Sequence, residues 1–132
     1  MVAVLDANTL IQYVEKDHPR HAETVDLLAS IEDDFVVAGV NLAEVLVGAV
    51  RADRGHAVLA SIIDSLGAEI HDGRGAEWAM RVATLRAAVS PAISLPDAYC
   101  LATALVTQGS VVTFDASLRA SSISRGVQVH PH

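Results

Sequence analysis

Short apolar runs and longer amphipathic segments alternate along the whole chain. The runs are rich in β-branched residues and predict strands at residues 2–5, 35–38, 68–71, 111–114 and 127–130. Apolar residues recur every three or four positions between the runs and predict helices at residues 9–15, 19–31, 41–52, 56–66, 76–89 and 97–107. Strands that alternate with helices indicate an α/β fold, with a parallel sheet covered on both faces.

Polar and glycine residues mark the expected ends of these elements. Asn41 precedes an apolar helical stretch and is a candidate N-cap. Gly67, Gly109 and Gly126 each fall just before a predicted strand, where the preceding helix would end on a left-handed residue.

Composition limits the class of protein. The chain has 132 residues, 52% of them hydrophobic, which is enough for one domain spanning residues 1–132. We find no linker-like segment, no secretory leader and no apolar run of the roughly 20 residues that a membrane helix requires. We therefore expect a cytoplasmic protein that does not enter a membrane. The only cysteine, Cys100, lies among small apolar residues and is expected to be a buried structural thiol.

Charge narrows the functional classes. The formal net charge of −7 argues against nucleic-acid binding through a broadly basic surface. It leaves open a site in which carboxylates hold metal ions, because the ions reverse the local sign of charge. The six histidines show no metal-ligand spacing and are expected at the surface.

Four acidic residues interrupt apolar segments. Asp6 ends the first predicted strand and Asp115 follows the fourth, so a parallel sheet places both at the same edge. Glu44 and Asp97 each lie within an otherwise apolar helix. Three of them can each be explained without a shared site. Asp97 can interact with the dipole of a helix that Ser94 caps, Glu44 can be exposed, and Asp115 can cap a short helix.

A shared site explains all four acids together. Clustered carboxylates repel one another unless a cation compensates them. An all-oxygen set without histidine or cysteine favours Mg²⁺ or Mn²⁺. Asn8 and Thr113 are candidate supporting residues that would orient the carboxylates or water. Such sites are suited to phosphodiester hydrolysis and need no nucleophilic side chain.

The segments that carry the acids also resemble a known family. "LDANTLI", "NLAEVLVG", "LPDAYCLATAL" and "VVTFDASL", in this order, look like the four acidic motifs of PIN-domain nucleases, and at this length most like VapC-type ribonuclease toxins. The resemblance implies an α/β/α sandwich with a mostly parallel sheet, Mg²⁺- or Mn²⁺-dependent RNA cleavage, a homodimer and an antitoxin partner. It assigns the catalytic and metal-binding positions to Asp6, Glu44, Asp97 and Asp115, with Asn8 and Thr113 in support.

Other classes fit less well. A dehalogenase-like phosphotransferase or a response-regulator receiver would need a lysine late in the chain, and Lys16 is the only lysine. A module that keeps the acids only to bind an ion or a basic partner remains the alternative to an enzyme. Six arginines could contact RNA, but a solvated surface is the favoured interpretation for each: Arg51, Arg54, Arg74, Arg81, Arg86 and Arg119.

Overall fold

A five-stranded parallel sheet forms the middle of the protein in the computed structural model, which describes residues 1–132. The strand order is β3-β2-β1-β4-β5, and every neighbouring pair is parallel. The first strand in the sequence is therefore the central strand of the sheet. The strands are β1 (Val2–Leu5), β2 (Asp34–Ala38), β3 (Glu69–His71), β4 (Ser110–Val112) and β5 (Val129–His130).

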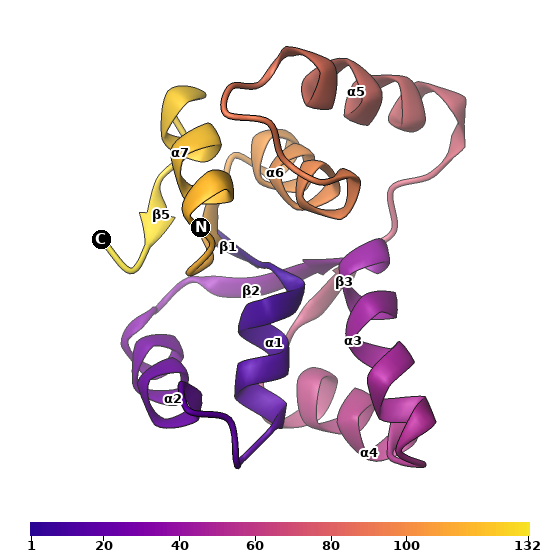
Figure 1. The fold of residues 1–132 in the computed structure, drawn as a ribbon, viewed down its shortest axis with the longest axis vertical. Coiled ribbons are helices and arrows are strands. Elements are labelled where there is room, and N and C mark those ends of the chain that lie inside the picture. The colour runs from indigo at the N-terminus through magenta and orange to yellow at the C-terminus, as the bar shows by residue number, and fades with distance from the viewer.

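Helices cover both faces of this sheet (Figure 1). The elements are α1 (Ala7–Val14), α2 (His21–Ser30), α3 (Gly39–Arg51), α4 (Gly55–Ala60), a π-helical turn η1 (Ser61–Ser65), α5 (Gly75–Ala88), α6 (Leu95–Thr107) and α7 (Ala116–Ser124). The predicted α/β/α sandwich is thus confirmed. None of these helices has both the length and the apolar character needed to cross a membrane.

Alternate residues of the central strands supply two separate cores. Val4 belongs to the cluster beneath α5, α6 and α7, whereas Ala3 and Leu5 belong to the cluster beneath α1 to α4. The same alternation divides Val111 from Val112 on β4. Successive side chains of a strand point to opposite faces, so strands that are apolar throughout fit only a sheet buried on both sides.

Two helical regions differ from the sequence-based expectation. The segment predicted as one helix over residues 56–66 is divided into α4 and the turn η1. The helix α7 was expected only as one interpretation of Asp115, as a short helix that this residue caps. Its nine residues include four serines, and its apolar positions show no clear periodicity. It lies beside β5 and covers the end of the sheet formed by the last two strands (Figure 1).

The predicted helix ends are partly correct. Gly67 and Gly126 have φ of 74° and 77°, as expected for residues that end a helix before a strand. The left-handed residue after α6 is Gln108 rather than Gly109. Gly109 is required for a different reason, since a Cβ there would lie 2.6 Å from the carbonyl oxygen of Val2. The predicted N-cap role of Asn41 is wrong, because α3 begins two residues earlier and encloses it.

Candidate functional site

Three of the four predicted acids lie at the carboxyl edge of the sheet. The strand register places Asp6 and Asp115 there, and the direction of α6 places Asp97 there. Leu5 of β1 pairs with Val112 of β4, so the residues that follow them, Asp6 and Thr113, are neighbours. Asp115 comes two residues after Thr113, at the start of α7. The helix α6 runs back to the amino end of β4, and its own first turn, which contains Asp97, therefore lies at the carboxyl edge.

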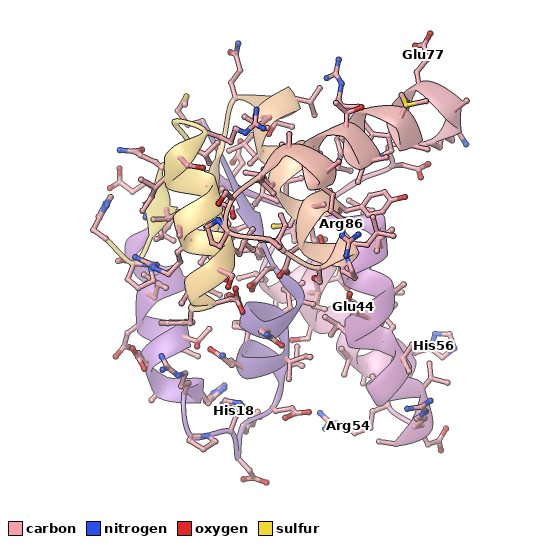
Figure 2. The ribbon with its side chains drawn as sticks, turned by 45° about the horizontal axis from the view of Figure 1, so that its top comes forward. His18, Glu44, Arg54, His56, Glu77 and Arg86 are labelled. Carbon is pink, nitrogen blue, oxygen red and sulfur yellow. The ribbon has the colours of Figure 1, made fainter.

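Glu44 reaches the same region from α3, which starts directly after β2. Its side chain lies on the side of α3 that faces the middle of the molecule (Figure 2). Glu44 is exposed, as one interpretation of the sequence expected. Partial burial still raises its pKa, and the charge of Asp6 raises it further, so the two carboxylates are close enough to interact. The structure therefore brings together all four acids that the sequence singled out.

Asp6 is almost completely buried, and hydrogen bonds hold its carboxylate in place. Its Oδ1 accepts a hydrogen bond of 2.8 Å from the backbone N–H of Thr9, which makes Asp6 the N-cap of α1. Its Oδ2 accepts a hydrogen bond from the hydroxyl of Thr113. Burial raises the pKa of Asp6, and the charge of Asp115 adds to the rise, whereas the bonds from Thr113 and Thr9 oppose it. These bonds orient the carboxylate without neutralising its charge.

Thr113 links Asp6 to the third acid. Its hydroxyl oxygen accepts a hydrogen bond of 3.0 Å from the backbone N–H of Asp115 while it donates to Asp6. The Oδ1 of Asp115 in turn accepts from the N–H of Leu118 at 2.8 Å, so Asp115 is the N-cap of α7. The capping interpretation of Asp115 is correct, and it leaves the second carboxylate oxygen available.

Asp97 shows the electrostatic strain of the cluster most directly. Burial, followed by the charges of Asp115, Asp6 and Glu44, raises its pKa from 3.8 to about 6. The expected cap of its helix is confirmed, because Ser94 Oγ accepts from the Asp97 N–H at 3.2 Å. That bond lowers the pKa of Asp97 slightly but does not offset the like charges.

No cationic side chain compensates the cluster. The two ion pairs of the protein, Arg20–Glu23 and Arg74–Asp72, involve other residues. Arg119, the arginine nearest in sequence to Asp115, instead donates to the backbone carbonyl oxygens of Thr113 and Pro131 at 3.0 and 2.5 Å. Four mutually repelling carboxylates without a counter-charge are the arrangement that a bound cation stabilises.

The four oxygen-bearing side chains suit a hard divalent cation, although they do not form a closed set of ligands around one point. All four side chains offer oxygen, which suits Mg²⁺ or Mn²⁺. No three of the His, Cys, Asp and Glu side chains are positioned to hold one ion together. This is compatible with Mg²⁺, which commonly keeps several waters and is held by one or two carboxylates together with substrate phosphates.

Asn41 is a member of this region that the sequence interpretation misassigned. It is 1% exposed, and its Nδ2 donates to the carbonyl oxygen of Pro96 at 3.0 Å. This bond joins α3 to α6 next to Glu44 and Asp97. Its Oδ1 is buried and has no partner within the protein, so it is a further oxygen suited to a bound water or ion. Only the tertiary packing of two distant helices reveals this role.

The remaining residues that the sequence analysis singled out agree with its expectations only in part. Asn8 is exposed in the first turn of α1, and the bonds that orient Asp6 come from Thr9 and Thr113 instead. Cys100 is fully buried, as expected for a structural thiol. None of the six histidines is buried, although His71 and His130 are only partly exposed and each has one buried ring nitrogen.

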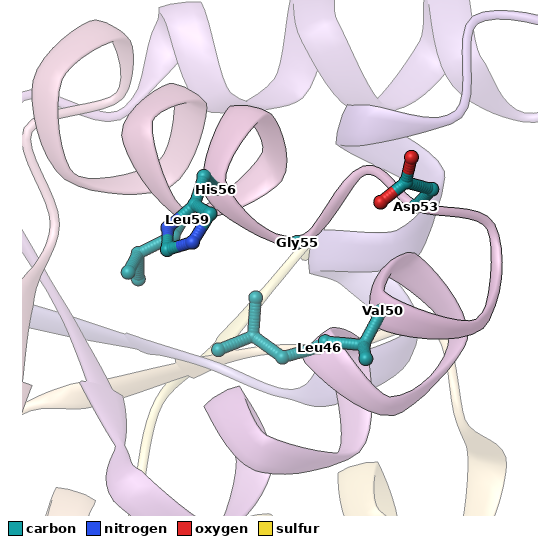
Figure 3. A pocket seen from close by; sticks show the side chains of 6 residues that line it. All are labelled: Leu46, Val50, Asp53, Gly55, His56 and Leu59. Atoms are coloured by element: carbon teal, nitrogen blue, oxygen red, sulfur yellow. The ribbon is translucent and has the colours of Figure 1, made fainter.

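A separate hollow of about 310 Å³ lies between the second half of α3 and α4 (Figure 3). Leu46, Val50 and Leu59 form its apolar wall. Asp53 is the only carboxylate among the lining residues. This hollow therefore lacks the clustered oxygens of the edge site and is not a second metal site.

The fold and the edge site define an α/β/α protein with clustered acids at the carboxyl end of a parallel sheet. The pattern of the PIN domain matches residues 3–122. The chain belongs to the PIN-domain family. Among curated proteins, no sequence matches it.

Solved structures support the same fold. The sarcin-ricin loop cleaving toxin VapC20 of Mycobacterium tuberculosis superimposes with a TM-score of 0.74 at 15% identity, over 89% of this chain and 93% of that chain. A toxin-antitoxin complex from Klebsiella pneumoniae gives 0.71 at 24% identity, over 89% and 90%. VapBC2 from Rickettsia felis, bound to a promoter DNA fragment, gives 0.70 at 17% identity, over 98% of both chains.

Proposed function

We propose that the protein is a Mg²⁺- or Mn²⁺-dependent endoribonuclease that hydrolyses phosphodiester bonds in single-stranded or loop RNA. The observation that carries the proposal is the meeting of Asp6, Glu44, Asp97 and Asp115 without a cationic partner. Burial, together with the charges of the other three acids, raises the pKa of Asp97 to about 6. Membership of the PIN-domain family supports it, as does a fold shared with the RNA-cleaving toxin VapC20.

The four acids would hold the ion, and the rest of the site would position them. A divalent ion bound there supplies positive charge at the scissile phosphate and lowers the pKa of water for in-line attack. Thr113 keeps the carboxylate of Asp6 in a fixed orientation and ties it to the backbone of Asp115. Asn41 fixes the start of α6, and therefore Asp97, relative to Glu44 on α3.

The biological role that we propose is the toxin of a toxin–antitoxin pair, in which a small antitoxin protein blocks the acidic site. An arginine of such a partner would fit the uncompensated carboxylates, because its planar guanidinium binds them in a bidentate manner. The structural relatives include toxin–antitoxin complexes. Co-expression with the neighbouring open reading frame tests this role. Equal survival with and without that neighbour would favour a housekeeping nuclease.

RNA cleavage in defined metal buffers tests the enzymatic proposal. Purified protein should cut a single-stranded RNA in Mg²⁺ or Mn²⁺ and stop in excess EDTA. Asp97→Asn should be inactive, whereas Asp26→Asn, which changes an exposed acid on α2, should match the wild type. Cleavage that is undiminished in EDTA would contradict the proposal.

A non-catalytic module that binds an ion or a partner is the second candidate. It is favoured by the open geometry, in which no three side chains form a ready set of ligands. Such a module would bind Mg²⁺ or Mn²⁺ in a titration and depend on the same acids, yet release no RNA fragments. Metal binding and RNA cleavage measured on one preparation therefore separate the two candidates.

A further inference from the structure

A second hollow lies along the same edge of the sheet as the acids. It has a volume of about 280 Å³, at the small end of the range for ligand pockets. Its lining comes from the carboxyl end of β3 and the starts of α3 and α5, together with α6, and includes His71, Trp78, Tyr99 and Thr103. Trp78 and Tyr99 are two of the five Phe, Trp and Tyr residues of the chain, and the imidazole of His71 lies with them.

The position of this hollow relative to the acids follows from the strand order. Asp6 follows β1, and His71 ends β3, which is two strands away in the same parallel sheet. Neighbouring strands are about 4.8 Å apart, so the two places are separated by roughly 10 Å along the edge. The helices α3 and α6 contribute to both the hollow and the acidic site. Ala43 and Tyr99 line the hollow, whereas Glu44 and Asp97 belong to the acidic site. Neighbouring nucleotides of one extended strand can bridge such a separation.

The rings of the hollow are arranged in close contact. The centroids of His71 and Trp78 are 5.1 Å apart, with the ring planes tilted by 50°. Gly73 permits this packing, because a Cβ there would lie 2.5 Å from the indole of Trp78. Nδ1 of His71 is buried and has no hydrogen-bond partner. An unpaired buried nitrogen costs free energy, so the His71 ring would gain a hydrogen bond if it turned this nitrogen toward a ligand in the hollow.

A third hollow continues from the same two rings and adds positive charge. It has a volume of about 340 Å³, shares His71, Gly73 and Trp78 with the second hollow, and is also lined by Arg74, Arg81 and the carboxylate of Glu77. Arg74 lies 3.9 Å from Asp72, which lines the second hollow, whereas Arg81 has no ion pair. An aromatic compartment beside one that contains two arginines and a single carboxylate resembles the two parts of a nucleotide. Bases stack on aromatic rings irrespective of sequence, and arginines bind the phosphate.

We propose that the His71–Trp78–Tyr99 hollow binds one unpaired base of the RNA substrate, with the phosphate beside that base directed to Arg74 and Arg81. The proposal rests on the proposed ribonuclease function and adds to it a place where the strand is held next to the acids. Stacking requires a base that is out of its duplex, so the hollow would favour single-stranded or looped RNA over paired RNA.

The fluorescence of Trp78 reports on this hollow directly, because it is the only tryptophan of the chain. The wild-type protein is titrated in EDTA, without cleavage, with single-stranded RNA tetranucleotides of one base type each and with a fully paired duplex of matching sequence. We expect saturable quenching by the single strands and much weaker quenching by the duplex. RNA cleavage without any change in Trp78 fluorescence would overturn the inference. Quenching without cleavage would leave it standing and remove the ribonuclease proposal.

Variants distinguish stacking in the hollow from general attraction to RNA. Loss of one aromatic stacking contact weakens single-strand binding by roughly 5- to 150-fold, and we expect Trp78→Leu to fall in this range when binding is read by anisotropy of a labelled oligonucleotide. Because Trp78 also packs against the core, His71→Phe provides a second variant that keeps a ring and removes the unpaired nitrogen. It should alter the preference among the four base types. The exposed Met80→Ala on the same helix should bind as the wild type does, and equal binding by all three variants would overturn the inference.

Discussion

At the scale of single residues, Asp97 combines a pKa raised to about 6 with the absence of a cationic partner. Burial is the largest cause of the raised pKa, and the charges of Asp115, Asp6 and Glu44 add to it. A group in this environment stabilises the folded protein only when a proton or a cation neutralises it. Its charge therefore favours metal binding and opposes folding in the absence of metal.

Neutralising this residue should separate activity from stability. We expect Asp97→Asn to abolish metal-dependent cleavage and to increase the free energy of unfolding in metal-free buffer by about 1 kcal/mol, after allowance for solvent screening of a half-exposed group. Thermal unfolding with and without EDTA measures this, and the expected increase in Tm is roughly 2–5 °C. A variant with wild-type turnover would remove Asp97 from the catalytic set.

The stability of the metal-free protein should fall as the pH rises toward 6. The pKa of Asp97 is 3.8 in the reference state and about 6 in the fold, so between these values the folded state binds more protons than the unfolded state. The contribution of Asp97 is fully present below pH 4 and is lost as the pH passes 6. Urea unfolding in EDTA at pH 4.5, 5.5 and 7 should show this slope in the wild type and a weaker one in Asp97→Asn. Metal binding should change in the opposite direction and strengthen between pH 5 and 7.

At the scale of secondary-structure elements, the site depends on how α3 and α6 meet. The hydrogen bond from Asn41 to the carbonyl oxygen of Pro96 is a direct polar link between their first turns. The two bonded residues are 55 positions apart in the sequence, so no local chain connection holds the two helices together. The alignment of Glu44 with Asp97 therefore relies on tertiary packing.

Removing that link should weaken both the fold and the site. Asn41→Leu leaves the Pro96 carbonyl without its partner, and we expect a loss of about 1–3 kcal/mol in the free energy of unfolding. Metal affinity should fall in the same variant, measured by titration at a temperature where the variant is folded. Gln128→Leu serves as the control, because Gln128 is exposed and lies directly before β5, the edge strand beyond β4. Unchanged metal affinity in a destabilised Asn41→Leu would limit Asn41 to a structural role.

Two glycines offer a matched test of close backbone packing. A Cβ at Gly109 would lie 2.6 Å from the Val2 carbonyl oxygen, whereas nothing lies within 4 Å of a Cβ at Gly48. We expect Gly109→Ala to lower the free energy of unfolding by about 1–3 kcal/mol through overpacking. Gly48→Ala lies inside α3 and should raise it by about 0.5–1 kcal/mol through helix propensity. Urea denaturation of both variants measures the difference, and equal stabilities would show that β1 yields readily at this contact.

Some elements could be predicted from local sequence, and others could not. The buried strands and most helices have strong apolar periodicity, and the acids at strand ends follow from parallel geometry. The helix α7 lacks such periodicity and is held by its Asp115 cap and by packing of Leu118 beneath it. The hydrogen bond of Asn41 and the meeting of His71 with Trp78 depend on contacts between elements, which a local pattern does not contain.

At the scale of the whole molecule, apolar side chains remain uncovered on the layer formed by α5, α6 and α7. Met80, Val106 and Ile123 are 68%, 43% and 60% exposed. A hollow of about 470 Å³ on this layer is lined in part by Met80, Leu85 and Leu105. Exposed apolar groups beside an apolar hollow are typical of surfaces that a second protein covers, although Val47 and Val50 of α3 are exposed on the other layer as well.

We expect this layer to join two copies of the chain in a homodimer. Light scattering at micromolar concentration should give a dimer for the wild type and a monomer for the double variant Met80→Glu, Leu105→Glu, which places charge in the apolar surface. Ile63→Glu, an exposed apolar position on the other helical layer, should remain dimeric. A wild-type monomer would exclude the dimer, and an unchanged dimer in the double variant would place the interface elsewhere.

The position of β1 in the middle of the sheet has a consequence for synthesis on the ribosome. The strand emerges first, but β4, which completes its second edge, follows about a hundred residues later, and the hydroxyl that holds Asp6 lies 107 positions further along the chain. A nascent chain that stops before Thr113 therefore has an open central strand and an unassembled acidic site. Such distant pairing forms late in folding, so the acidic site is complete only after the segment from Thr113 to Asp115 has been synthesised.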